Sequence, residues 1–209
     1  MLSAREALDR LREGNRRFAS SLSSPGETPS HVRRAELVAG QEPFAIILGC
    51  SDSRVPAEIV FDQGLGDLFV IRVAGNIVAP SQVGSVEFAA ARFGTRLVVV
   101  LGHSSCGAVV ATLEELRGTP RSESRNLRFI VDRVRPSVEG LLGEGRAAGD
   151  PADLLKRAVR ANILAAASQL RHGSPLLEQL IRDDGLLVVG AEYSLETGVV
   201  DVFDGIGAL

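Results

Sequence analysis

The chain of 209 residues is 45% hydrophobic and 23% charged, which is ordinary for one globular domain that buries its core without disulfides. Its net charge of −3 gives no reason to expect nucleic acid or an anionic membrane as a partner. No apolar run is long enough to span a membrane, and the first residues lack the form of a signal peptide. We therefore expect a protein of the reducing cytoplasm.

The first part of the chain predicts a helical arm. Ser3 can cap a first helix that ends near Ser20, and a loop rich in Ser, Pro and Gly follows over residues 21–29. Ser30 then begins a short helix that Gly40 can end. The first helix has an apolar stripe on one side, formed by Leu8, Leu11 and Phe18.

Strands and helices alternate through the rest of the chain. Short apolar runs predict strands at 44–48, 68–73, 97–101 and 186–189, and a turn at 196–198 leads into an antiparallel hairpin partner at 199–203. Helices are predicted at a turn beginning at Pro56 and over 81–93, 105–116, 126–140, 151–171 and 175–182, with a polar loop over 117–125. This alternation predicts a single α/β domain, residues 1–209, with a mostly parallel sheet in the flavodoxin-like order 2-1-3-4 plus an antiparallel edge strand.

Two short motifs follow the first and third predicted strands, at the edge where open α/β sheets bind ligands. They are Gly49-Cys50-Ser51-Asp52-Ser53-Arg54-Val55-Pro56 and Gly102-His103-Ser104-Ser105-Cys106-Gly107. They contain both cysteines and one of the three histidines of the chain. Two thiols, an imidazole and a carboxylate are ligand types of a four-coordinate zinc site. We expect Cys50, His103 and Cys106 to bind Zn²⁺, with Asp52 as a fourth ligand or beside an open position.

Each of these residues also has an ordinary interpretation. A lone cysteine is usually a small core residue, His103 could be a buried structural histidine, and Asp52 and Arg54 could be a helix cap and a solvated charge. The spacing of the two motifs favours the metal site. A helix beginning at Ser105 would place Cys106 in its first turn, where the positive end of the helix dipole favours a thiolate.

The two motifs resemble those of the β-class carbonic anhydrases. Cys-Ser-Asp-Ser-Arg at 50–54 and His-x-x-Cys at 103–106 have the paired spacing of that family. The resemblance continues through residues 59–76 and 84–89 and covers most of 7–113. It implies reversible hydration of CO2 to bicarbonate and a proton, by attack of zinc-bound hydroxide.

In this mechanism Asp52 and Arg54 act as a pair. Arg54 is expected to draw the carboxylate of Asp52 away from zinc and leave a position for water. Asp52 then accepts the hydrogen of the hydroxide and orients its lone pair towards CO2. The family also contains closed sites, in which the aspartate coordinates zinc itself. Neither His31 nor His172 has an evident place near the site, so we expect both at the surface and buffer as the proton acceptor.

The resemblance also implies a substrate pocket and an oligomer. Gln41, Phe69 and Phe88 match a glutamine, a phenylalanine and a tyrosine that line the family's pocket, partly across the dimer interface, and Gly107 joins them. Phe88 departs from that tyrosine and lacks its hydroxyl. A homodimer or a dimer of dimers is expected, with the helical arm of residues 1–40 contributing to it.

Some members of the family close their site through bicarbonate bound in a separate pocket that includes a tryptophan. That position is Ile47 here, and the chain has no tryptophan. We therefore predict no bicarbonate switch of this kind. A change of pH is the remaining way in which the site could reach the closed state.

Two other functions compete with this interpretation. A hydrolase of carbon disulfide or carbonyl sulfide would share the metal chemistry and differ in access to the pocket. A non-catalytic zinc or redox-sensing protein would use Cys50 and Cys106 only structurally, behind a closed shell of four ligands. The Asp52–Arg54 pair counts against this second alternative, because a structural site needs no cation that competes for its ligand.

Overall fold

The computed structural model describes residues 2–22, 31–119, 124–142 and 150–208. Most of the loop predicted at 21–29, the helix start predicted at Ser30 and part of the loop predicted at 117–125 lie outside the described residues. None of the described helices is both long enough and apolar enough to cross a membrane.

A five-stranded sheet forms the centre of the molecule, in the order β2-β1-β3-β4-β5. Its strands are β1 (Ala45–Gly49), β2 (Leu68–Arg72), β3 (Leu97–His103), β4 (Leu187–Tyr193) and β5 (Val200–Asp204). Strands β1 to β4 run parallel to one another, and β5 is antiparallel to β4. The predicted order and the antiparallel edge strand are confirmed.

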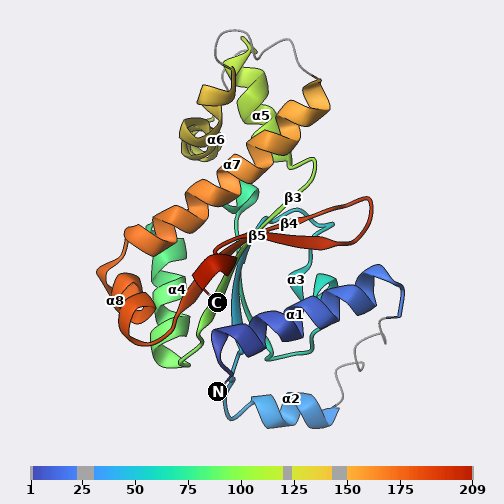
Figure 1. The fold of residues 1–209 in the computed structure, drawn as a ribbon, viewed down its shortest axis with the longest axis vertical. Helices are drawn as coiled ribbons and strands as arrows, with labels where there is room; N and C mark the ends of the chain where they lie inside the picture. The colour runs from blue at the N-terminus through green and yellow to red at the C-terminus, as the bar shows by residue number, and fades with distance from the viewer. Residues whose placement is uncertain (1, 23–30, 120–123, 143–149, 209) are drawn as a thin grey trace.

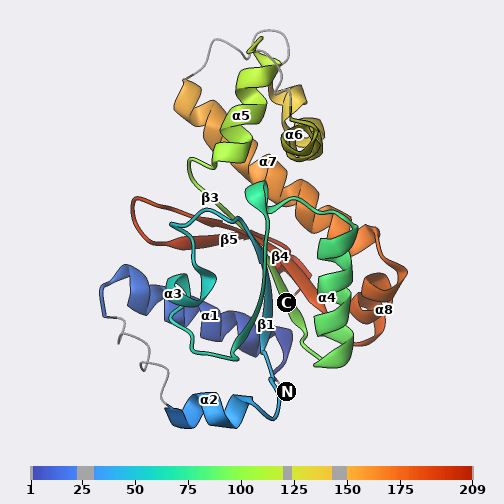
Figure 2. The same cartoon turned by 180° about the vertical axis from the view of Figure 1, so that it is seen from behind.

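Helices cover both faces of this sheet (Figures 1 and 2). They are α1 (Ala4–Ala19), α2 (His31–Leu37), α3 (Ala57–Val60), α4 (Pro80–Arg92), α5 (Gly107–Leu116), α6 (Arg125–Val138), α7 (Pro151–His172) and α8 (Pro175–Asp183). Short 3₁₀ turns lie at η1 (Ala74–Asn76), η2 (Glu139–Leu142) and η3 (Ile206–Ala208). Helices α1 and α3 share one hydrophobic cluster with the sheet, whereas α4 to α8 share another on the opposite face.

The two central strands, β1 and β3 up to Gly102, are continuously apolar because both of their faces are buried. In β1, Ile46 and Leu48 point into the cluster of α4 to α8, while Ala45 and Ile47 point towards α1 and α3. This is the side-chain alternation of a strand between two helical layers. Continuous apolar runs in the sequence were therefore a sound indication of a buried parallel sheet.

Helix α1 begins as the sequence predicts but packs within its own chain. Ser3 and Glu6 form a reciprocal capping box, in which the Ser3 backbone N–H donates to the Glu6 carboxylate over 2.8 Å. Leu8 and Leu11 are each 1% exposed and pack on the sheet. The apolar stripe of this helix is therefore covered by its own sheet, and the stripe gives no separate argument for a partner subunit.

One buried amide fastens α1 to the far end of the chain. The Asn15 side-chain N–H groups donate to the carbonyls of Val60 and Gly198 over 3.1 and 2.8 Å. The Asn15 Oδ1 accepts the backbone N–H of Val200 over 2.8 Å. These bonds join α1, the end of α3 and the start of β5. Helix α2, in contrast, has no buried residue.

Candidate metal centre

Three side chains with metal-binding atoms meet at the carboxyl ends of two neighbouring strands. Cys50 follows β1, His103 is the last residue of β3, and Cys106 lies three positions further on. Because β1 and β3 are parallel and adjacent, with Gly49 opposite Leu101, their ends meet at one edge of the sheet. The ligand atoms of all three residues lie within 4.8 Å of one another, and all three residues are buried. The convergence that the two motifs predicted is therefore present.

The position of Cys106 differs from the predicted one. Helix α5 begins at Gly107, and Cys106 is its N-cap residue with an extended backbone (φ −65°, ψ 118°). Ser105 has the left-handed backbone (φ 57°), which ends the turn after β3 and prevents the helix from beginning there. Cys106 therefore stands just before the helix and not in its first turn.

The two thiols contact each other, and this contact moves their pKa values in opposite directions. A hydrogen bond from the Cys106 thiol lowers the pKa of Cys50 to about 4, against the opposing effect of burial. The same contact, together with burial, raises the pKa of Cys106. Backbone N–H groups at the start of α5 lower the pKa of Cys106 but do not outweigh these effects. The contact between the two sulfurs thus favours a thiolate at Cys50, while the N–H groups at the start of α5 favour one at Cys106.

The imidazole of His103 presents one free nitrogen to the two sulfurs. Its Nδ1 lies 2.9 Å from the backbone carbonyl oxygen of Ser104, which fixes the proton on Nδ1. Its Nε2 is buried and has no hydrogen-bond partner among the described residues. A buried nitrogen without a partner is costly unless it binds something, and beside two thiols this donor set fits Zn²⁺. The acceptor of Nδ1 is a backbone group, so no side-chain pattern could have revealed it.

A glycine turn supports the first cysteine from the other side. The backbone N–H of Gly75 donates to the Cys50 Sγ over 3.3 Å. The Gly75 carbonyl accepts from the buried Asn162 side chain over 2.8 Å. Gly75 has a φ of 70°, and a Cβ at this position would lie 2.8 Å from the Cβ of Ala108. The turn therefore requires glycine, and Gly75-Asn76 is more than a simple connection.

Asp52 and Arg54 form a two-pronged ion pair beside the three ligands. The Arg54 Nε donates to Asp52 Oδ1 over 2.9 Å and the Nη2 donates to Oδ2 over 2.7 Å. The Arg54 backbone N–H also donates to Oδ1, over 3.0 Å. These bonds hold the pKa of Asp52 well below its usual range. The Oδ2 of Asp52 lies 3.8 Å from the His103 Nε2, so the carboxylate borders the site.

Arg72 fixes the backbone between Cys50 and Asp52, a role that the sequence did not indicate. It ends β2, opposite Gly49. Its Nε donates to the Cys50 carbonyl over 3.0 Å and its Nη2 to the Asp52 carbonyl over 2.6 Å. The only signal for it was its place at the carboxyl end of the strand next to β1.

The expected pocket residues lie apart from the metal ligands within one chain. Phe69 pairs with Ile46, four residues before Cys50, which is about 13 Å along the strands. Its ring centroid lies 6.2 Å from that of Phe88, whose residue is 55% exposed. Both rings contact Phe93, which lines a surface cavity of about 680 Å³ together with Gln41.

Gly107, in contrast, begins α5 directly beside Cys106 and faces open space, because a Cβ there would meet nothing within 4 Å. The assignment of these four residues to a substrate pocket stays a prediction.

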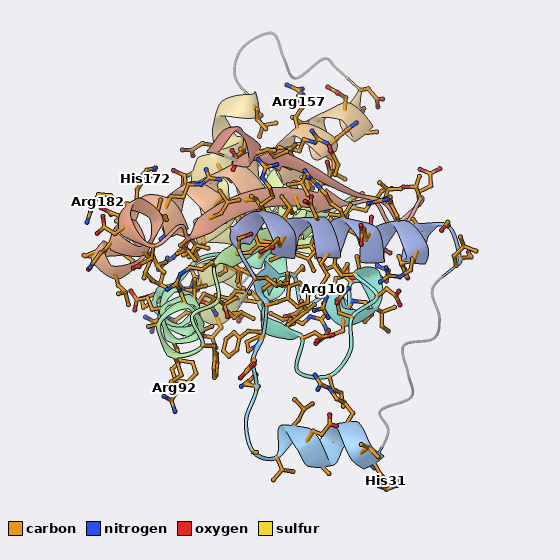
Figure 3. The ribbon with its side chains drawn as sticks, turned by 60° about the horizontal axis from the view of Figure 1, so that its bottom comes forward. Arg10, His31, Arg92, Arg157, His172 and Arg182 are labelled. Carbon is orange, nitrogen blue, oxygen red and sulfur yellow. The ribbon has the colours of Figure 1, made fainter. Side chains whose placement is uncertain are left out.

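The other residues named from the sequence occupy ordinary positions. His31 and His172 are exposed and lie on α2 and at the end of α7, far apart at the periphery (Figure 3). Ile47 is fully buried in the cluster between the sheet and α1.

Comparison with known proteins agrees with this geometry. The family model described as carbonic anhydrase matches residues 45–200. The chain is 41% identical to carbonic anhydrase 2 of Mycobacterium tuberculosis (strain H37Rv), over 94% of this chain and 91% of that protein. It is also 41% identical to the carbonic anhydrase of Mycolicibacterium smegmatis, over 94% and 92% of the two chains.

Solved structures of β-carbonic anhydrases share the fold. The enzyme CafA of Aspergillus fumigatus superposes with a TM-score of 0.74 at 26% identity, covering 96% of this chain and 90% of that one. The enzyme of Coccomyxa, solved with acetazolamide, gives a TM-score of 0.71 at 25% identity and covers 96% and 89%. With the cysteine, histidine and cysteine ligands meeting at the sheet edge, the chain belongs to the β-class carbonic anhydrase family.

Proposed function

We propose that the chain catalyses the reversible hydration of CO2 to bicarbonate and a proton with Zn²⁺ held by Cys50, His103 and Cys106. The observation that supports this most directly is the buried His103 Nε2, which has no partner among the described residues and lies beside two sulfurs. When bound there, zinc supplies a Lewis acid that lowers the pKa of water and so provides hydroxide near neutral pH.

Asp52 is placed so that Arg54 controls its distance from the metal. Two ligands of one tetrahedral zinc, at bond lengths of about 2.0–2.1 Å, are separated by about 3.3 Å. The Asp52 Oδ2 and His103 Nε2 are 3.8 Å apart, so a small movement would bring the carboxylate to coordinating distance. The two bonds from Arg54 oppose that movement and keep one coordination position accessible to water.

The same pair orients the attacking water. Both oxygens of Asp52 accept hydrogen bonds from Arg54, and its low pKa keeps the carboxylate ionised at neutral pH. An ionised carboxylate has further lone pairs, so Asp52 can also accept a hydrogen bond from the water. This hydrogen bond orients the water so that a lone pair of the water oxygen points towards the carbon of CO2. The products are bicarbonate and one proton, which buffer removes.

The experiment that tests this compares matched alanine variants. Asp52→Ala and Arg54→Ala should keep about one zinc per chain yet lose most CO2 hydration, measured by stopped flow. Arg17→Ala and Asp62→Ala break another arginine–aspartate pair, joined over 2.5 Å on the α1 side, and serve as controls that keep activity.

Full activity in both site variants would contradict the mechanism. Assays of sulfide release from carbon disulfide and carbonyl sulfide in the same preparations distinguish the alternative hydrolase.

We further propose a homodimer or dimer of dimers in which residues 1–40 contribute to the interface and Gln41, Phe69, Phe88 and Gly107 line the substrate pocket. Support comes from α2, which has no buried residue, and from Phe88, which is 55% exposed beside two other rings. Light scattering after gel filtration tests the assembly. A cytoplasmic location suits the two free, buried cysteines, which must stay reduced to bind metal.

A further inference from the structure

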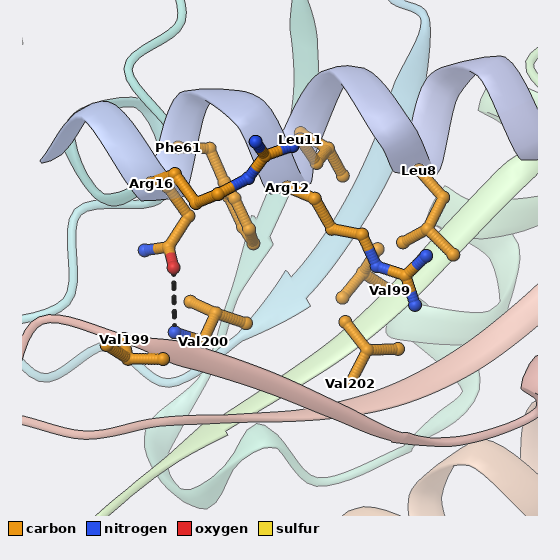
Figure 4. Close-up of a pocket in the computed structure, with 10 residues that line it drawn as sticks. Leu8, Leu11, Arg12, Arg16, Phe61, Val99, Val199, Val200 and Val202 are labelled. Carbon is orange, nitrogen blue, oxygen red and sulfur yellow. Dashed lines mark hydrogen bonds between the residues drawn. The ribbon is translucent and has the colours of Figure 1, made fainter. Parts of the chain in front are cut away.

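A second cavity, remote from the metal ligands, lies between α1 and the sheet (Figure 4). It encloses about 250 Å³, just below the range of about 300–1,000 Å³ that is usual for small-molecule sites. Its walls are mainly aliphatic and aromatic, formed by Leu8, Leu11, Phe61, Val99, Val199, Val200 and Val202. A space of this size and character suits one short alkyl chain or one ring.

Two guanidinium groups lie over this apolar space. Both Arg12 and Arg16 line the cavity, and Figure 4 shows Arg12 extending from α1 towards Val99 and Val202, while Arg16 runs along the helix near Leu11. They are four residues apart on one helix, so their like charges repel each other. No acidic side chain is among the described residues that line the cavity.

The arginines of α1 differ in whether they have partners. Away from the cavity, Arg17 pairs with Asp62 over 2.5 Å and Arg10 with Asp67 over 3.1 Å. Over the cavity, Arg12 forms one ion pair among the described residues, with the exposed Asp9 over 3.6 Å. The side chain of Arg16 makes no hydrogen bond or ion pair with the residues that the structure describes. Among the described residues, the charge of Arg12 is therefore partly balanced by the exposed Asp9, whereas that of Arg16 has no acidic partner.

The cavity is held open by a defined contact. The buried Asn15, 5% exposed, lines it and accepts the backbone N–H of Val200 over 2.8 Å, the dashed line in Figure 4. This bond and the two that Asn15 donates set the spacing between α1 and β5. An apolar pocket with fixed walls and a few placed charges is the usual form of a small-molecule site.

We propose that this cavity binds a small amphipathic carboxylate, whose short apolar body enters between α1 and β5 while Arg12 and Arg16 bind its carboxylate. Arginine suits this task because its planar N–H groups match a carboxylate. The anion also removes the repulsion between the two guanidinium groups. The proposal is independent of the reaction at the metal centre.

The test is a titration of the zinc-loaded protein with octanoate, followed by calorimetry and by NMR of labelled valine and leucine methyl groups. We expect octanoate to shift the methyl signals of Val99, Val200 and Val202. 1-Octanol should bind at least tenfold more weakly, because it lacks the charge that the arginines recognise. Acetate should leave these signals unchanged, because it has no chain to fill the cavity.

Variants test the two parts of the site separately, the arginine rim that binds the carboxylate and the apolar cavity that binds the alkyl chain. The double change Arg12→Gln and Arg16→Gln should raise the Kd for octanoate about tenfold or more, whereas Arg117→Gln, an exposed arginine at the end of α5, should change it less than twofold. Val202→Phe fills the cavity and should abolish the methyl shifts. If that variant fails to fold, the double arginine variant decides, because both of its positions are on the rim.

Several results would overturn the proposal. They are equal affinity for octanoate and 1-octanol, a Kd unchanged in the double arginine variant, shifts confined to the metal centre, or no binding up to the solubility of octanoate. Contacts between this cavity and a second copy of the chain in a crystal or cross-linked oligomer would also overturn it, because the cavity would then be part of a subunit interface.

Discussion

Replacing Gly75 with alanine should destabilise both the fold and the metal centre. The residue has a φ of 70°, which costs an L-amino acid about 1–2 kcal/mol. The new Cβ would lie 2.8 Å from the Cβ of Ala108, and overpacking of this kind costs about 1–3 kcal/mol. The lower entropy of the unfolded alanine chain offsets about 0.4–1 kcal/mol. We expect a net loss of about 1–5 kcal/mol, and its middle value corresponds to a fall in Tm of about 6–12 °C.

Calorimetry of the zinc-loaded protein measures this loss, and competition with a chelator measures the effect on the metal. Because the Gly75 N–H donates to the Cys50 Sγ, a shifted turn should also weaken zinc binding. Gly84→Ala is the matched control, since it lies within α4 and its Cβ would meet nothing within 4 Å. That change should leave the Tm unchanged or raise it slightly. If Gly75→Ala matched Gly84→Ala in both Tm and zinc affinity, our account of this turn would be refuted.

Four further outcomes are expected at the metal centre. Arg54→Lys should retain only part of the activity, because an ammonium group cannot form both bonds to Asp52; wild-type rates in stopped flow would argue against control by the pair. The pKa of Asp52 is lower in the folded protein than in the unfolded chain, where it is about 3.9. The ionised carboxylate therefore stabilises the folded protein above pH 3.9, and this contribution is lost only as pH falls through the lower folded pKa. Between pH 6.5 and 9 the carboxylate stays ionised, so Asp52→Asn should lower the rate throughout this range, and a rate equal to that of the wild type would argue against its role. Arg72→Gln should lower both zinc affinity and rate by releasing two backbone carbonyls, and unchanged values for both would show that these bonds are dispensable. Both cysteines should react with a thiol reagent only after chelation, because they are 6% and 1% exposed; rapid reaction before chelation would count against their role as ligands.

The sequence predicted the sheet well because its strands are buried on both faces. Such strands appear as short apolar runs, and the alternation of strands and helices predicted a mostly parallel sheet. The strand order depended on the further expectation that the first and third strands are neighbours, which the structure confirms. The boundaries were less accurate where buried polar residues interrupt a run. Strand β4 was expected to end at residue 189 but continues to Tyr193. Glu192 is 8% exposed and is neutralised by Arg160, whose Nε lies 2.7 Å from its carboxylate.

The cluster of Cys50, His103 and Cys106 was predictable because the side chains of these residues determine their chemistry, whereas the groups that hydrogen-bond to them were not. Cys50 and His103 could be placed from strands that precede them and from the spacing of their motifs. Their supports include the carbonyl of Ser104 and the N–H of Gly75, backbone groups that every residue type presents. The start of α5 was misplaced for a similar reason, since the left-handed backbone of Ser105 is uncommon for serine and leaves no pattern in the sequence.

The position of Asn15 has a consequence for how the chain is made. Its partner Gly198 is 183 residues away, so the ribosome must synthesise nearly the whole protein before the bond can form. At about 5–20 residues per second, this delay is about 10–40 s. During that time Leu8 and Leu11 have no completed sheet to cover them, and the nascent chain exposes its amino-terminal apolar stripe to chaperones and to other copies of itself.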